Sequence, residues 1–122
     1  MLFMKHLISL AQAKIMTAKF RSEKDNVIKA EYHDKNILPV AETFERAAID
    51  KLLASPGCVA LRIYHGMNDE LQLHSVMVAV DIDDRDILPK PEPLNLEEEE
   101  AVIVEEGTLC PPVCGQGSEL NP

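Results

Sequence analysis

The sequence predicts an α+β fold, in which two helices pack on an antiparallel β-hairpin that a third strand could extend, followed by an extended acidic, proline-rich tail. Two stretches with helical hydrophobic spacing and two β-rich runs joined by a polar turn carry this prediction. A chain of 122 residues with 46% apolar residues can bury one modest core. Aromatic residues make up only 4% of the chain, so we expect an aliphatic core.

The first helix is expected over residues 10–22. Ser9 and Gln12 have the spacing of a capping box at a helix start. Ala13, Met16 and Phe20 follow at helical intervals, so they define the apolar side of this helix. Residues 23–36 alternate only weakly between apolar and charged side chains and predict either a short strand or an ordered loop.

The second helix is expected over residues 39–54. Pro39 suits a first helical position because it has no N–H to lose and a preset φ angle. Behind it lies an apolar stripe with charged residues on the opposite side, formed by Val40, Phe44, Ala47, Ala48 and Leu52. Ser55-Pro56-Gly57 ends the pattern.

A β-hairpin is expected over residues 58–82, with a five-residue turn at 66–70 that places His65 opposite Leu71. One face then carries Val59, Leu61 and Ile63, which the two helices can cover. The other face is polar near the turn and apolar at its far end, formed by Cys58, Ala60, Val76 and Val78. This apolar end needs a cover: a third strand, an identical subunit, or residues 101–104 of the tail.

Charge is distributed unevenly along the chain. Residues 1–82 carry 10 acidic and 10 basic side chains, whereas residues 83–106 carry 10 acidic side chains against Arg85 and Lys90. This predicts a compact domain at 1–82, an acidic proline-rich linker at 83–100 and a C-terminal arm at 101–122. The neutral body and acidic tail exclude a nucleic-acid partner, and no apolar run is long enough to cross a bilayer.

The cysteines allow three interpretations. Cys58, Cys110 and Cys114 could hold a metal together with one of the histidines, which are His6, His33, His65 and His74. Cys110 and Cys114 could instead form a reversible disulfide, although the intervening Pro111-Pro112 favours an extended chain that separates the sulfurs. We expect the third arrangement, in which the diproline stiffens a terminal arm and all three cysteines pack as small apolar groups.

The turn end of the hairpin offers a candidate ligand site. Arg62, Tyr64 and His74 converge there in the expected register and could bind a small anionic group. The alternative is that these long side chains reach water or pair with acidic neighbours. The chain carries no standard catalytic signature, so no catalytic residue or cofactor is predicted.

The segments Phe44–Leu53 and Pro56–Gly66, together with the later Cys-Pro-Pro-Val-Cys, resemble a family of short uncharacterised bacterial proteins. Members of that family similarly carry a helix, a Pro-Gly-Cys turn, an Arg-x-Tyr strand and a late Cys-Pro-Pro-x-Cys motif. The resemblance implies that Cys58, Arg62, Tyr64, Cys110 and Cys114 belong to one recurring constellation, but it implies no activity.

These features predict a cytoplasmic, non-catalytic module that self-associates or binds another protein. The reason for expecting self-association is the uncovered apolar end of the second sheet face. The alternatives are a thiol or metal protein that uses Cys58, Cys110 and Cys114, and a binder of a small anionic ligand that uses Arg62, Tyr64 and His74.

Overall fold

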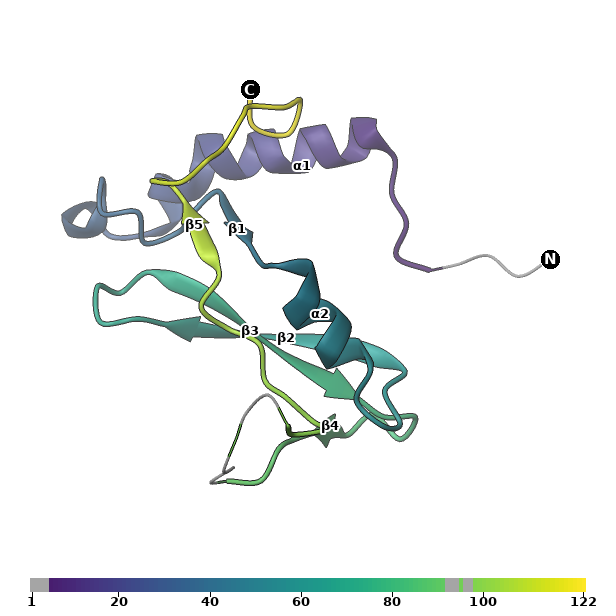
Figure 1. Ribbon diagram of the computed structural model, residues 1–122. Coiled ribbons are helices and arrows are strands. Elements are labelled where there is room, and N and C mark those ends of the chain that lie inside the picture. Colours follow the sequence, from purple (N-terminus) through teal and green to yellow (C-terminus); the bar gives the residue numbers. More distant parts are fainter. Residues whose placement is uncertain (1–4, 92–94, 96–97) are drawn as a thin grey trace. The chain divides into compact units, whose positions relative to one another are not determined.

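The computed structural model describes residues 5–91, 95 and 98–122. The α+β class is confirmed, with two α-helices and antiparallel sheets (Figure 1). The chain divides into two compact units, which we call the helical unit (residues 1–41 and 109–122) and the sheet unit (residues 42–108). The division at residues 83 and 101 expected from composition stays a prediction.

The helical unit begins with α1 (Leu10–Glu23), close to the expected range. The capping box is present, because the Ser9 hydroxyl accepts the Gln12 N–H at 3.1 Å and the Gln12 side chain accepts the Ser9 N–H at 3.0 Å. Two 3-10 turns follow, η1 (Lys24–Val27) and η2 (Ala30–Tyr32). Of the two alternatives for residues 23–36, the ordered loop is therefore the one observed.

The expected start of the second helix is wrong. Residues from Pro39 onward lead into β1 (Ala41–Thr43), which pairs with β5 (Thr108–Cys110), and the Val40 N–H donates to the Cys110 carbonyl at 2.8 Å. Helix α2 spans only Arg46–Leu53, because Glu45 still has an extended backbone with ψ of 141°. Pairing with a distant strand therefore takes precedence over the helical pattern at residues 39–45.

The hairpin is confirmed as β2 (Ala60–Met67) and β3 (Leu73–Val80), and β3 also pairs with β4 (Asp86–Ile87). The expected register is wrong, because His65 lies opposite Ser75 rather than Leu71. This shift of four residues is an even number, so every side chain stays on its expected face. The expected turn at 66–70 lies two residues too early.

The core of the sheet unit lies between α2 and one face of the sheet (Figure 1). Leu52 of α2 is completely buried against the strand residues Met77 and Ala79. Val102 and Val104 complete this cluster, and Val104 exchanges two backbone hydrogen bonds with Met77, at 2.8 and 3.0 Å. The residues after the acidic segment thus join the core on the first face, and not the second face that they were expected to cover.

The second sheet face differs from the expectation that supported a dimer. Val78 and Val80 are each only 3% exposed, so the β3 part of this face is buried within the chain itself, although Ala60 of β2 is exposed. Arg62 of β2 pairs with Asp86 of β4, and both lie on the same face as these valines of the intervening strand. The side-chain bridge therefore crosses β3 on this face, and the original reason for a dimer no longer holds.

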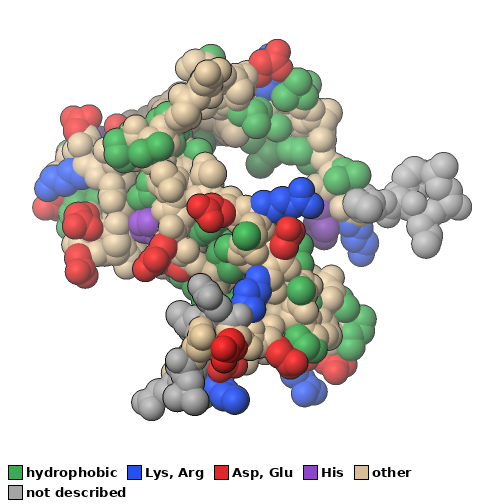
Figure 2. All heavy atoms as spheres, in the orientation of Figure 1, with side chains coloured by type: hydrophobic (Ala, Val, Ile, Leu, Met, Phe, Trp, Pro, Cys, Tyr) green, Lys and Arg blue, Asp and Glu red, His purple; other side chains and the backbone are tan. Residues whose placement is uncertain are grey.

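The molecular surface is mixed in character. Figure 2 shows acidic, basic and hydrophobic side chains interspersed over the face that it presents. Among the described residues, neither α1 nor α2 combines the length and apolar content that crossing a bilayer requires.

Candidate functional site

Arg62 and Tyr64 form a polar network with β4. Arg62 Nη1 donates to Asp86 Oδ1 at 2.6 Å, and its Nη2 donates to Asp84 Oδ1 at 2.5 Å. The Tyr64 hydroxyl donates to the other oxygen of Asp86, also at 2.5 Å. Both side chains thus contact carboxylates of their own chain, which is the arrangement that competes with binding of an external anion.

These contacts shift the pKa values of Asp86 and Arg62. The hydrogen bond from the Tyr64 hydroxyl lowers the pKa of Asp86, the hydrogen bond and charge of Arg62 act in the same direction, and partial burial opposes them. The hydrogen bond to Asp86 is the main cause that raises the pKa of Arg62 above its usual value. These contacts therefore favour the charged forms of both Arg62 and Asp86.

His74, the third predicted ligand residue, lies in a different cluster. It lies opposite Gly66, whereas Arg62 and Tyr64 lie opposite Val78 and Val76. Its Nδ1 atom is 2.8 Å from Glu42 Oε2 and 3.0 Å from Glu105 Oε1. The three predicted residues share a face but have separate partners, so they do not form one site.

Glu42, His74 and Glu105 offer three ligand atoms within 4.8 Å of one another, which is the spacing of a metal site. Asn68, which contacts Nε2 of His74, argues against metal binding at this cluster. Oδ1 of Asn68 accepts the backbone N–H groups of Glu70 and Gln72, at 3.0 and 2.9 Å, so the Asn68 NH2 group faces His74 Nε2 at 3.2 Å.

The orientation of Asn68 therefore selects the histidine tautomer. Nε2 of His74 accepts a hydrogen bond, and the ring hydrogen lies on Nδ1, where it points to the two glutamates. A metal on Nδ1 would require the hydrogen on Nε2, facing the Asn68 NH2 group. Metal-binding histidines normally donate from this second nitrogen to an oxygen, so the cluster fits a metal poorly.

Sequence reasoning missed Glu42 and Glu105. Glu42 was expected within a helix, but it lies in β1, where its second oxygen accepts the Ser75 N–H at 2.9 Å. Gly107 allows this approach, because a Cβ at this position would lie only 2.5 Å from Glu42 Cγ. Contacts with β3 also hold them, because Glu42 accepts the Ser75 N–H and Glu105 follows Val104, which bridges Met77; no local sequence pattern signals these distant contacts.

The expectation of unbridged cysteines in a stiff arm is wrong for two of the three. Cys110 and Cys114 form a disulfide with a Cα–Cα distance of 4.6 Å. The expectation rested on trans prolines, whereas the bonds preceding Pro111 and Pro112 are both cis. Cys58 is a free thiol whose sulfur contacts the Ala60 carbonyl at 3.3 Å. No cysteine belongs to a potential metal-binding cluster within the described part of the chain.

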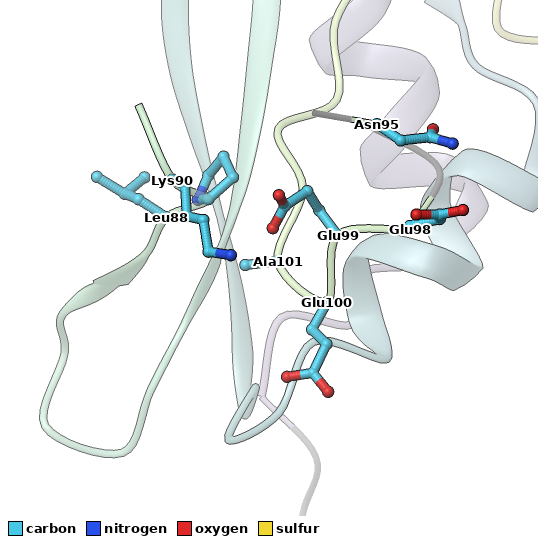
Figure 3. Close-up of a pocket in the computed structure, with 8 residues that line it drawn as sticks. Leu88, Lys90, Asn95, Glu98, Glu99, Glu100 and Ala101 are labelled. Atoms are coloured by element: carbon cyan, nitrogen blue, oxygen red, sulfur yellow. The ribbon is translucent and has the colours of Figure 1, made fainter. Parts of the chain in front are cut away.

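Two cavities open on the sheet unit. The larger, about 520 Å³, has Leu88 and Lys90 on one wall and Glu98–Ala101 on the other (Figure 3). The walls are joined by a segment that includes residues outside the described part, so no site is assigned there. The smaller cavity, about 230 Å³, adjoins His74 and Glu105 and also involves Gly66, Met67, Asn68 and Val76.

The edge of β2 is the third candidate site. In the sheet order β2-β3-β4, this eight-residue strand pairs on one side only among the described residues. On one face, Val59 just before the strand and Ile63 and Met67 within it are 59%, 50% and 59% exposed, and the exposed His65 lies between the last two. An open strand edge with exposed apolar side chains is a typical surface for pairing with another chain.

Comparison with known proteins adds no family. No family model, curated protein or solved structure matches this chain.

Proposed function

We propose that this protein is a non-catalytic self-associating module, in which the β2 edges of two copies pair antiparallel. The observation that carries this proposal is the set of exposed apolar side chains along β2, one edge of which has no partner strand among the described residues. Backbone hydrogen bonds would join the two sheets, and burial of these side chains would supply about 25 cal/mol per Å² of apolar surface.

This set of side chains is self-complementary. Val59 and Met67 lie at equal distances of four residues on either side of Ile63. In an antiparallel pair with a two-fold axis at Ile63, Val59 faces Met67 of the second copy and Ile63 faces its own equivalent. A second copy of this chain is therefore a well-matched occupant of the edge.

The strand also lacks the features that usually prevent edge pairing. Residues 60–67 contain no proline and no lysine. Their one permanent charge, Arg62, is already paired with Asp84 and Asp86 of the same chain. Pairing of two β2 edges would therefore bring together no unpaired permanent charge on these strands.

Sedimentation velocity over a range of protein concentrations tests the proposal. We expect a monomer–dimer equilibrium in the natural sequence and a monomer in Ile63→Lys, because two ammonium groups would then face each other at the axis. Ile82→Lys is the matched control, since Ile82 is also exposed but lies outside β2. A monomeric natural sequence at all concentrations would overturn the proposal.

A charge-rescue pair tests the register and guards against simple misfolding of one variant. Val59→Asp and Met67→Lys should each weaken the dimer at least tenfold. The double variant should recover part of this loss, because residue 59 of one copy faces residue 67 of the other. Absence of recovery in a folded double variant would contradict this register.

A second candidate function, reversible thiol–disulfide exchange, is favoured by the Cys110–Cys114 bridge. Cys114 is exposed whereas Cys110 is buried, so a partner thiolate would attack the Cys114 sulfur and release Cys110 as a thiolate. A second thiol of the partner then resolves the mixed disulfide, and the partner dithiol is oxidised. Alkylation in graded glutathione buffers tests this step, and a bridge that stays closed in every buffer would exclude it.

The cytoplasmic location expected from the sequence remains part of this proposal, and it requires the bridge to open under reducing conditions. Membership of the family of short bacterial proteins is likewise proposed from the motif resemblance alone. Neither point assigns an activity.

A further inference from the structure

The smaller cavity of the sheet unit has the dimensions of a side-chain pocket. Its volume of about 230 Å³ lies below the range of about 300–1,000 Å³ typical of pockets for drug-sized ligands. Gly66 helps to keep it open, because a Cβ at this position would lie 3.1 Å from Val76 Cγ2. Val76 supplies apolar wall atoms, and Glu105 supplies a carboxylate. The pocket therefore fits a short apolar group that ends in a positive charge.

The hydrogen bonds around His74 leave negative charge beside this pocket. The Nδ1 hydrogen is the one hydrogen that the imidazole offers to two carboxylates, Glu42 and Glu105. Glu42 also accepts the Ser75 N–H, and its side chain is only 11% exposed. Glu105 is 36% exposed, and among the described residues the ion pairs of both glutamates are with His74. An imidazole carries at most one positive charge and cannot balance two carboxylates, so a cation is the complementary ligand.

A metal ion is a poor candidate for this cation because Asn68 keeps Nε2 of His74 as an acceptor. Reversing the Asn68 amide would give up two hydrogen bonds from backbone N–H groups. An ammonium group needs no change of tautomer. Its three donors can also reach oxygens of different residues, whereas the planar guanidinium of arginine suits a single carboxylate.

We propose that the pocket binds a primary ammonium group on a short aliphatic stem, with the stem along Val76 and the nitrogen at Glu105. The group is either a free alkylamine or the lysine side chain of a bound segment, since both present the same chemistry. This site lies within one copy of the sheet unit, so it does not depend on dimerisation at β2.

NMR titration of the full chain tests the site. n-Butylamine, which copies the lysine side chain, should cause saturable shifts of the Gly66, Met67 and Val76 amides, whereas n-butanol at the same concentrations should not. Glu105→Gln should weaken binding about ten- to a hundredfold, as expected for loss of a charge-assisted hydrogen bond. Glu106→Gln is the matched control and should bind normally, because the neighbouring Glu106 is not part of the pocket.

A second variant separates loss of the site from loss of the fold. Gly66→Ala keeps every charge but adds a methyl group beside Val76, and it should also weaken butylamine binding while the chain stays folded. Equal binding of butanol and butylamine, or equal effects of Glu105→Gln and Glu106→Gln, would overturn the proposal. So would zinc-induced shifts at His74 that block butylamine.

Titration with a lysine peptide distinguishes a free alkylamine from a lysine side chain as the natural ligand. Acetyl-Gly-Lys-Gly-amide should bind at least as tightly as n-butylamine if a lysine of an extended segment is the natural occupant. Weaker binding of the peptide identifies a free amine as the ligand. Ile63→Lys, tested in the same way, should retain the site even where it abolishes the dimer.

Discussion

Each of the two units of this chain is stabilised by a different kind of interaction. In the sheet unit, α2 and the sheet bury a continuous aliphatic cluster around Leu52, Met77 and Ala79. In the helical unit, the buried hydrophobic residues among those described are Ile37 and Cys110, and α1 buries none. A disulfide and a few backbone hydrogen bonds stabilise this second unit. A substitution in one unit is therefore expected to act mainly on the stability of that unit.

The largest expected effect is in the sheet unit. Leu52→Ala removes a completely buried side chain, so it should lower the free energy of unfolding by about 2–5 kcal/mol. Chemical denaturation measures this loss, together with faster hydrogen exchange at Met77. Leu53→Ala is the matched control and should cost only about 0.5 kcal/mol, because Leu53 is partly exposed. Equal losses in the two variants would contradict a core centred on Leu52.

Removing the Cys110–Cys114 disulfide should lower the stability of the helical unit. The double variant Cys110→Ser/Cys114→Ser loses a short closed loop worth about 2 kcal/mol, which corresponds to about thirtyfold faster exchange in that unit. The Val40 and Val113 amides report on it, because they donate to the Cys110 and Leu109 carbonyls.

The Met77 amide should be unaffected by that change, and Cys58→Ser should leave both units unchanged. Faster exchange at Met77 in the double variant would show that the two units unfold together.

The smallest expected effect concerns pH. The pKa of Asp86 is lowered mainly by the Tyr64 hydroxyl, so its contribution to stability is present above its unfolded pKa and is lost as pH falls through the folded value. Tyr64→Phe should raise the pKa of Asp86 and weaken the acid dependence of unfolding, whereas Tyr32→Phe should not. Carboxyl NMR titration measures the pKa directly, and an unchanged value in Tyr64→Phe would contradict the assigned cause.

Local patterns explain which parts of the fold could be predicted. Helix α1 has its own capping box, and the two strands carry period-two hydrophobicity, so their approximate ranges followed from the sequence. The turn was misplaced because Gly66 was taken as a turn residue. Gly66 lies within β2, and Asn68 organises the loop by accepting two backbone N–H groups.

Distant pairing explains what could not be predicted. The start of α2 depends on β1 pairing with β5, and Glu42 meets Glu105 through distant contacts that include β3. The disulfide joins two cysteines across Pro111 and Pro112, whose preference for an extended chain argued against it. The prediction that Arg62, Tyr64 and His74 share a face is confirmed, but their partners Asp86 and Glu42 lie outside the hairpin.

The most direct test of self-association through β2 is a cross-link at its proposed two-fold axis. Directly opposite residues in antiparallel strands have Cα atoms about 4.5–5.5 Å apart, within reach of a disulfide. In a Cys58→Ser background, Ile63→Cys should form a covalent dimer rapidly under mild oxidation, while the exposed Ile82→Cys should not. A monomeric Ile63→Cys, or one that cross-links no faster than Ile82→Cys, would contradict pairing at β2.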